Sequence, residues 1–304
     1  MTDLELALIR SYDHSTQSFD RGTLSIFADT LSASGDPRGE LIQLELEGNP
    51  HTARRRSLER EWLGDVPESI EVRPWCGFID IHIDNFQHRS RHGVSPIPVT
   101  QAFLGSKYRR VIRELTVRGN HALISAALAA ICDGPPMPFL DRIRFMSTDG
   151  DNNHRAGVAG AAFIAATPHL RSLLLQGVAT YEAIQHPAVE RLVIRGAHAL
   201  FQPSVWDRVT RLIYDIEPLP STDYSTQSII NLFQTMQFPA LVHLDLDNNN
   251  DHLPRDYDIF ELLAGVDLSP TVEDVRMPRR WRHLQAGWLA TARARHPHAI
   301  IREV

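Results

Sequence analysis

The sequence predicts an α/β protein whose strands form one curved parallel sheet, preceded by an α-helical cap. From about residue 71 onward, the chain repeats an apolar spacing typical of short strands, and most intervals between these strands carry a helical pattern. Before that point the hydrophobic pattern is helical throughout. A chain of 304 residues is long enough to bury a sizeable core. We therefore expect a helical cap over residues 1–70 and a sheet-forming unit over residues 71–304.

The clearest copy of the spacing runs from Leu241 to Asn249. Its sequence, LVHLDLDNN, reads Leu-x-x-Leu-x-Leu-x-x-Asn, which is the strand and turn of a leucine-rich repeat. Side chains alternate along a strand, so Leu244 and Leu246 face the same side. We expect that side to be the core, and the fold to be a leucine-rich-repeat solenoid.

Eight copies of the apolar spacing occur in order, and the middle residue of each serves as a register mark. Consecutive marks are 34, 28, 30, 19, 20, 32 and 31 residues apart. Strands that always return to the sheet in the same sense become parallel neighbours. The two short steps leave room only for an extended or single-turn crossover. The register marks are Ile81, Leu115, Ile143, Leu173, Leu192, Leu212, Leu244 and Val275.

The repeats are irregular. Asparagine occupies the turn position only at Asn120 and Asn249, so no continuous asparagine ladder is expected. Helices are expected near residues 225–236, 257–264 and 280–296. A last strand over residues 299–302 is expected to pair with the open edge of the sheet and cap it.

Four amphipathic helices are expected in the cap, over residues 3–12, 24–31, 37–47 and 52–63. Gly35, Asp36 and Pro37 predict a tight joint between the second and third helices. Glycine suits the left-handed position after a helix, aspartate caps the next helix, and proline fits its first turn. Arg38 and Glu40 are interpreted as ion-pair or capping partners, and the run 54–56 (RRR) as a solvated helix face.

Several stretches in and just after this cap share the residues of a known domain. They are 27–31 (FADTL), 35–44 (GDPRGELIQL), 61–64 (EWLG) and 75–78 (WCGF). Together they resemble the repeat-companion domain that precedes leucine-rich repeats in many bacterial proteins. Thr30 departs from the tryptophan of that family. The resemblance covers about residues 20 to 80; it implies a non-catalytic interaction protein and offers no catalytic residues.

Charge and composition narrow the classes of partner. A net charge of −6 and a pI near 6.2 argue against a dedicated binder of nucleic acid or anionic membranes. The N-terminal stretch MTDLELALIRSYD lacks the basic region and long apolar core of a signal peptide, and no apolar run reaches membrane-spanning length. We expect a cytoplasmic protein in which Cys76 and Cys132 stay reduced.

No pattern in the sequence points to a metal, a cofactor or catalysis. Motifs for nucleophile elbows, zinc proteases, phosphate loops and dinucleotide binding are missing. His88 and His92 lack a third ligand in frame, and the acidic stretches 149–153 and 245–256 lack the glycine of a calcium loop. The expectation is therefore no metal, no cofactor and no enzyme.

A partner-binding face is expected on the concave side of the sheet, which is the side that faces away from the core. The residues immediately before and after each register mark, and those three positions after it, face away from the core, so they form three columns across the strands. In the middle of the sheet these columns place an apolar strip among arginines, which is the composition of a protein-binding hot spot for an acidic protein or peptide. Alternatively, a loop covers the strip, or it is a lightly exposed sheet face. The expected binding residues are Arg142, Arg144, Leu174, Arg191, Val193, Arg195, Arg211 and Ile213.

Three classes of function follow from these patterns. The favoured one is a non-catalytic protein-interaction scaffold that binds its partner on the concave sheet face. A special case is an immunity or regulatory subunit that inhibits a cognate toxin or enzyme. The least favoured is an enzyme whose scattered acids and histidines meet only in three dimensions.

Overall fold

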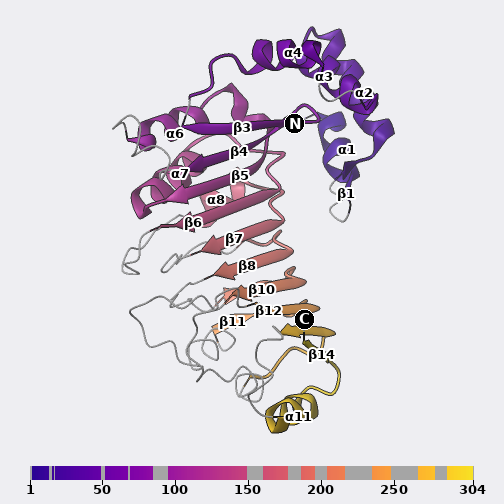
Figure 1. Ribbon diagram of the computed structural model, residues 1–304, viewed down its shortest axis with the longest axis vertical. Helices are drawn as coiled ribbons and strands as arrows, with labels where there is room; N and C mark the ends of the chain where they lie inside the picture. Colours follow the sequence, from indigo (N-terminus) through magenta and orange to yellow (C-terminus); the bar gives the residue numbers. More distant parts are fainter. Residues whose placement is uncertain are drawn as a thin grey trace.

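A ten-stranded, mostly parallel sheet dominates the structure, a computed structural model of mixed α/β architecture. Figure 1 shows its strands stacked in one column along the long axis of the molecule, with α1 to α4 at one end of the column. The structure describes residues 2–13, 16, 18–48, 52–67, 69–84, 95–148, 160–176, 186–195, 204–215, 235–247, 266–277 and 286–303.

The spatial order of the strands follows their order in the chain. Nine of them, from β4 to β14, are parallel neighbours. The strands are β3 (Ile70–Trp75), β4 (Phe78–Asp84), β5 (Ile112–Gly119), β6 (Arg142–Ser147), β7 (Ser172–Gln176), β8 (Arg191–Arg195), β10 (Arg211–Asp215), β12 (His243–Asp247), β13 (Asp274–Met277) and β14 (Ile300–Glu303).

The register expected from the apolar spacing is confirmed. Each of the eight register marks lies opposite the next across the sheet, from Ile81 beside Leu115 to Leu244 beside Val275. All eight are at most 2% exposed, because they point from one face of the sheet into the core. The last strand, β14, continues the alignment by placing Ile301 beside Val275 at the edge, where the edge strand was expected.

The core-side layer next to the sheet contains helices and a small second sheet. Helix α7 contacts β5 and β6, and neighbouring helices pack on it. The helices expected at 225–236 and 257–264 lie almost entirely outside the described residues. The elements are α6 (Pro96–Leu104), the 3₁₀ helix η1 (Lys107–Val111), α7 (His121–Asp133), α8 (Gly160–Ala166), α11 (Ala286–Arg295), and the parallel pair β9 (Ser204–Val205) and β11 (Met236–Gln237).

Four helices form the cap, and its sharpest joint is the one that the sequence predicts. Gly35 has a φ of 75°, the side chain of Asp36 accepts a hydrogen bond from the backbone N–H of Arg38, and Pro37 begins the next helix. Buried residues of the cap join those of the sheet in one continuous hydrophobic cluster. The helices are α1 (Asp3–Ser11), α2 (Arg21–Ala33), α3 (Pro37–Leu46) and α4 (Ala53–Leu63).

Three expectations for the N-terminal part are wrong. The cap is not purely helical, because β1 (Tyr12–Asp13) and β2 (Ser18–Phe19) form a short antiparallel pair. The sheet is not wholly parallel either, since β3 pairs antiparallel with β4 and ends the sheet. Arg55 is not part of a solvated run: its side chain is 13% exposed and binds both Glu45 and Glu59 at 2.7 Å.

Candidate binding face of the sheet

The outward side chains of the sheet form the columns expected from the sequence. Strand pairing places their members directly opposite one another, from β4 to β13. The first column contains Asp80, Glu114, Arg142, Ser172, Arg191, Arg211, His243 and Asp274. The second contains His82, Thr116, Arg144, Leu174, Val193, Ile213, Asp245 and Arg276.

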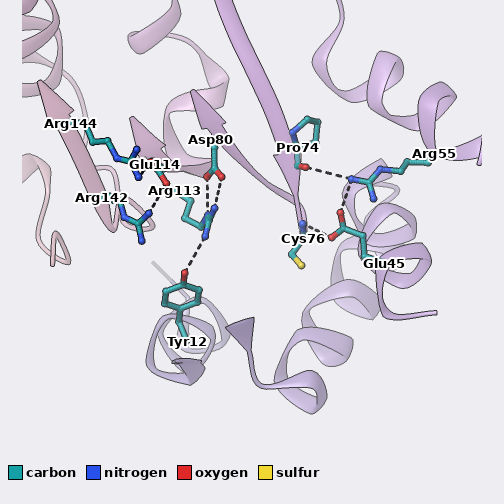
Figure 2. Close-up of polar contacts among 10 residues, drawn as sticks. All are labelled: Tyr12, Glu45, Arg55, Pro74, Cys76, Asp80, Arg113, Glu114, Arg142 and Arg144. Carbon is teal, nitrogen blue, oxygen red and sulfur yellow. Dashed lines mark hydrogen bonds and ion pairs between the residues drawn. The ribbon is translucent and has the colours of Figure 1, made fainter. Parts of the chain in front are cut away.

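One carboxylate neutralises part of the charge on β6. Glu114 lies 3.2 Å from the Nη1 atom of Arg142 and 3.0 Å from the Nη2 atom of Arg144, as Figure 2 shows. Arg142 is 19% exposed and Arg144 39% exposed. Glu114 therefore fixes two of the expected binding residues from the strand beside them.

A second charged group spans β10 to β14. Arg211 donates to one carboxylate oxygen of Asp245 through Nε at 3.0 Å and Nη2 at 2.6 Å. Arg276 lies 2.9 Å from Asp274 and 3.7 Å from Asp245, and Arg302 lies 3.1 Å from Asp274. Both carboxylates are buried. Ion pairing explains why two buried aspartates are tolerated on an outward-facing strand position.

Arg191 differs from Arg142 and Arg211, which lie in the same column. Among the residues that the structure describes, none forms an ion pair or a hydrogen bond with its guanidinium, and its side chain is exposed. Partial desolvation lowers the pKa of Arg191, and the charges of Arg211, Arg142 and Arg144 lower it further. The charge of Asp245 acts in the opposite direction, but none of the described carboxylates forms an ion pair with Arg191.

The apolar strip between the arginines is less open than expected. Val193 is only 4% exposed, so its side chain offers little contact surface. Leu174 and Ile213, on either side of it, are half-buried. Of the three apolar side chains expected in the strip, Val193 is therefore covered, and Leu174 and Ile213 are the accessible members.

Arg195 occupies a third column, two residues beyond Val193. Strand pairing places it beside Gln176 and Asp215. It has a polar interaction of its own, so it is not equivalent to Arg191. Arg195 therefore flanks the centre of the face without being part of its unpaired charge.

The cap reaches this face at its β4–β5 end. The guanidinium of Arg113 pairs with Asp80, donates to the hydroxyl of Tyr12 at 3.1 Å and lies 4.1 Å from the ring centre of Trp75. Figure 2 shows Arg113 between Asp80 and Tyr12. At the β4–β5 end of the face, the polar groups of Asp80, Arg113 and Tyr12 are thus already paired with one another.

A second polar group ties α3, α4 and β3 together. Glu45 accepts a hydrogen bond from the backbone N–H of Cys76 at 2.5 Å and pairs with Arg55, as Figure 2 shows. Burial, together with the charge of Glu45, raises the pKa of the Cys76 thiol far above its ordinary value. The thiol is therefore neutral and a poor nucleophile.

The described residues form no metal cluster and no membrane-spanning helix. In the described ranges, no three His, Cys, Asp or Glu side chains lie close enough together to hold a metal ion. His88, His92 and the acidic stretch 149–153 lie outside those ranges. Within the same part of the chain, the longest apolar helices are too short or too polar to cross a bilayer.

Sequence reasoning overlooked one residue of the face. Ser172, on β7, separates Arg142 on β6 from Arg191 on β8. Its position in the first column was readable from the spacing. A small side chain between two arginines was the available signal, but the expected site was chosen by charge and hydrophobicity alone.

The chain matches no protein-family model and no curated protein. Among solved structures, it is similar to the crystal structure of a structural-genomics target from Bacteroides fragilis. The sequences are 11% identical, the alignment covers 71% of each chain, and the TM-score is 0.38. A similarity this loose supports no inference about fold or function.

Proposed function

We propose that this chain is a non-catalytic leucine-rich-repeat scaffold that binds an acidic protein or peptide on the outer face of its sheet. The repeat assignment is supported by eight apolar marks in one register, with steps of 19 to 34 residues between them. The resemblance of the cap to the repeat-companion domain agrees with such an architecture.

The observation that carries the binding proposal is the unpaired charge of Arg191. The first two columns contain six arginines and only three carboxylates between β5 and β14. Those carboxylates pair with five of the arginines and leave Arg191 without one. An exposed arginine among like charges is stabilised when a partner supplies a carboxylate, and arginine is enriched among the residues that dominate interface energies.

The overall charge favours a local acidic segment over a polyanion. The whole chain carries a net charge of −6, so the positive centre of the face is a local feature of an acidic protein. Nucleic acid would be repelled by the remaining surface, whereas a partner with a confined acidic patch matches the face alone.

The test is a binding experiment with Arg191→Glu. The wild-type chain, Arg191→Glu and Arg56→Glu are used as baits in a pull-down from the native host, and the affinity of each enriched protein is then measured. Arg56 is an exposed residue of α4, so its variant makes the same change of charge away from the face. A genuine partner should bind the Arg56→Glu control like wild type and Arg191→Glu at least tenfold more weakly, about 1.4 kcal/mol.

Arg211→Glu is not used here, since it would also leave Asp245 without its closest partner. The proposal is wrong if every specific partner binds Arg191→Glu as tightly as wild type at both low and high salt. An inhibited toxin or enzyme among the partners would identify the chain as an immunity or regulatory subunit.

A further inference from the structure

Three hydrogen-bond donors at the centre of the face have no acceptor among the described residues. The Nε atom of Arg142 is buried and forms no hydrogen bond. Arg191 has no polar partner among the described residues, and the same holds for the hydroxyl of Ser172. These residues come from three adjacent strands and lie in the same column. The guanidinium of Arg191 is exposed and Ser172 is half-buried, so both can donate to a ligand, and the column has the composition of an anion site.

Ser172 creates the space for an anion. Adjacent strands lie about 4.8 Å apart, so the backbones of Arg142 and Arg191 are separated by about 9.6 Å with only a serine side chain between them. Two arginine side chains are long enough to turn toward one group in such a gap. The charge of Arg142 lowers the pKa of Arg191, in keeping with the closeness of the two side chains in the column.

The flanking acids favour a carboxylate over a more highly charged group. Glu114 already neutralises the far side of Arg142, and Asp245 neutralises Arg211 next to Arg191. What remains is one arginine without an ion-pair partner, and a single carboxylate can pair with it. A planar carboxylate also fits the fork of a guanidinium with two parallel hydrogen bonds.

Leu174 supplies the second half of the site. It lies on the same strand as Ser172, two residues further along, and is half-buried on the same face. The separation along the strand is about 6.6 Å, which equals the distance between side chains i and i+2 of an extended peptide. An extended partner segment that lies along β7 can therefore place an acidic side chain over Ser172 and an apolar one over Leu174.

We infer that the gap over Ser172, between Arg142 and Arg191, is a pocket for one carboxylate of an extended partner segment that has the pattern acidic-x-apolar, in either chain direction. This inference rests on the proposed binding function and names the kind of sequence that is recognised. The acid sets the position of the segment, and the apolar side chain covers Leu174 and excludes water from the ion pair.

The test uses synthetic peptides with blocked ends in a Gly/Ser background. Each contains one Glu and one Leu, separated by one to four positions, and affinities are measured by fluorescence anisotropy. Peptides with Glu and Leu two positions apart should bind about tenfold or more tightly than those with other separations, and than Gln-x-Leu and Glu-x-Ser peptides. Phosphoserine-x-Leu and an oligonucleotide serve as the competing anions.

Variants of the protein locate the site. Ser172→Leu fills the gap and Arg191→Gln removes the charge without adding bulk, so each should reduce binding of the best peptide at least tenfold. Ser172→Ala removes only a hydroxyl and should cost at most about tenfold. Arg56→Gln, on the cap, should bind as wild type does.

The outcomes separate this inference from the proposed function. If Arg191 governs binding of a protein partner but the peptides show no preference for the two-residue spacing, the carboxylate pocket is overturned and the binding face stands. A preference for three- or four-residue spacing, which a helix would show, or tighter binding of phosphoserine or nucleic acid, also overturns the pocket. A protein partner that ignores Arg191 overturns both.

Discussion

Arg109 and Arg191 place the same chemical group, a guanidinium, in opposite environments. Arg109, where η1 meets the ends of α6 and α7, is 1% exposed and has no acidic partner among the described residues, yet its guanidinium donates to several backbone carbonyls. Arg191, at the centre of the sheet face, is exposed and donates to none of the described residues. The acceptors for Arg109 are the carbonyl oxygens of Leu104, Ala130, Ile131 and Pro135.

The comparison separates arginines that build the fold from one that does not. Helix ends leave carbonyl oxygens without partners, and a single guanidinium fills that need where α6 and α7 terminate. Burial lowers the pKa of Arg109, so the hydrogen bonds must offset the cost of a buried charge. None of the described residues holds Arg191 in this way, which is why we propose a binding role for it and not a stabilising one.

The largest loss of stability is expected on substitution of the buried Arg109. Arg109→Met should lower the free energy of unfolding by about 3 kcal/mol or more, because four carbonyl oxygens lose their donors and the thioether replaces none of them. Urea titration followed by circular dichroism measures this loss. Arg56→Met, on the exposed face of α4, should change stability by less than about 0.5 kcal/mol. Equal midpoints for the two variants would remove the basis of the comparison.

The next largest loss of stability is expected at Gly134, next to Arg109, and depends on how tightly Arg109 is held. A Cβ atom at Gly134 would lie 2.6 Å from the Cζ atom of Arg109. A free side chain would move aside at little cost, but this guanidinium is fixed by its hydrogen bonds. Gly134→Ala should therefore cost about 2 kcal/mol of unfolding free energy.

A double-mutant cycle provides the control for that claim. In the Arg109→Met background the guanidinium is gone, so Gly134→Ala should add little to the loss of stability. Strict additivity of the two changes would show that the clash is with something other than the fixed guanidinium.

The register of the sheet could be predicted because burial imposes it. A strand shifted by one residue would turn its core-facing Leu244 and Leu246 toward the outer face, so the apolar spacing fixes both the strand and its alignment. The antiparallel strand β3 was not expected, because it contains Pro74 and proline usually interrupts a strand. An edge strand tolerates proline, since only one side of it has to pair.

The candidate site was only partly predictable for a related reason. Alternation along strands determines which side chains face outward, so the columns follow from the sequence. The choice of ion pairs does not: Arg211 binds Asp245, which lies one column over on the adjacent strand, and not its direct neighbour His243. Burial of Val193 likewise depends on the shape of the whole face, and alternation alone carries no information about it.

The smallest change in stability is expected at Arg191, and it can be compared directly with that at Arg211, its neighbour in the same column. Arg211→Gln should cost about 1 to 2 kcal/mol of unfolding free energy, since buried Asp245 loses its bidentate donor and keeps only Arg276, at 3.7 Å. Arg191→Gln should change stability by less than about 0.5 kcal/mol, or raise it slightly, because it breaks no pair and removes repulsion by Arg211, Arg142 and Arg144. Urea titrations at low and high salt measure both, and any gain from Arg191→Gln should shrink as salt screens the repulsion. A loss of stability for Arg191→Gln as large as that for Arg211→Gln would mean that Arg191 is a structural residue, and the contrast with Arg109 would then be one of degree.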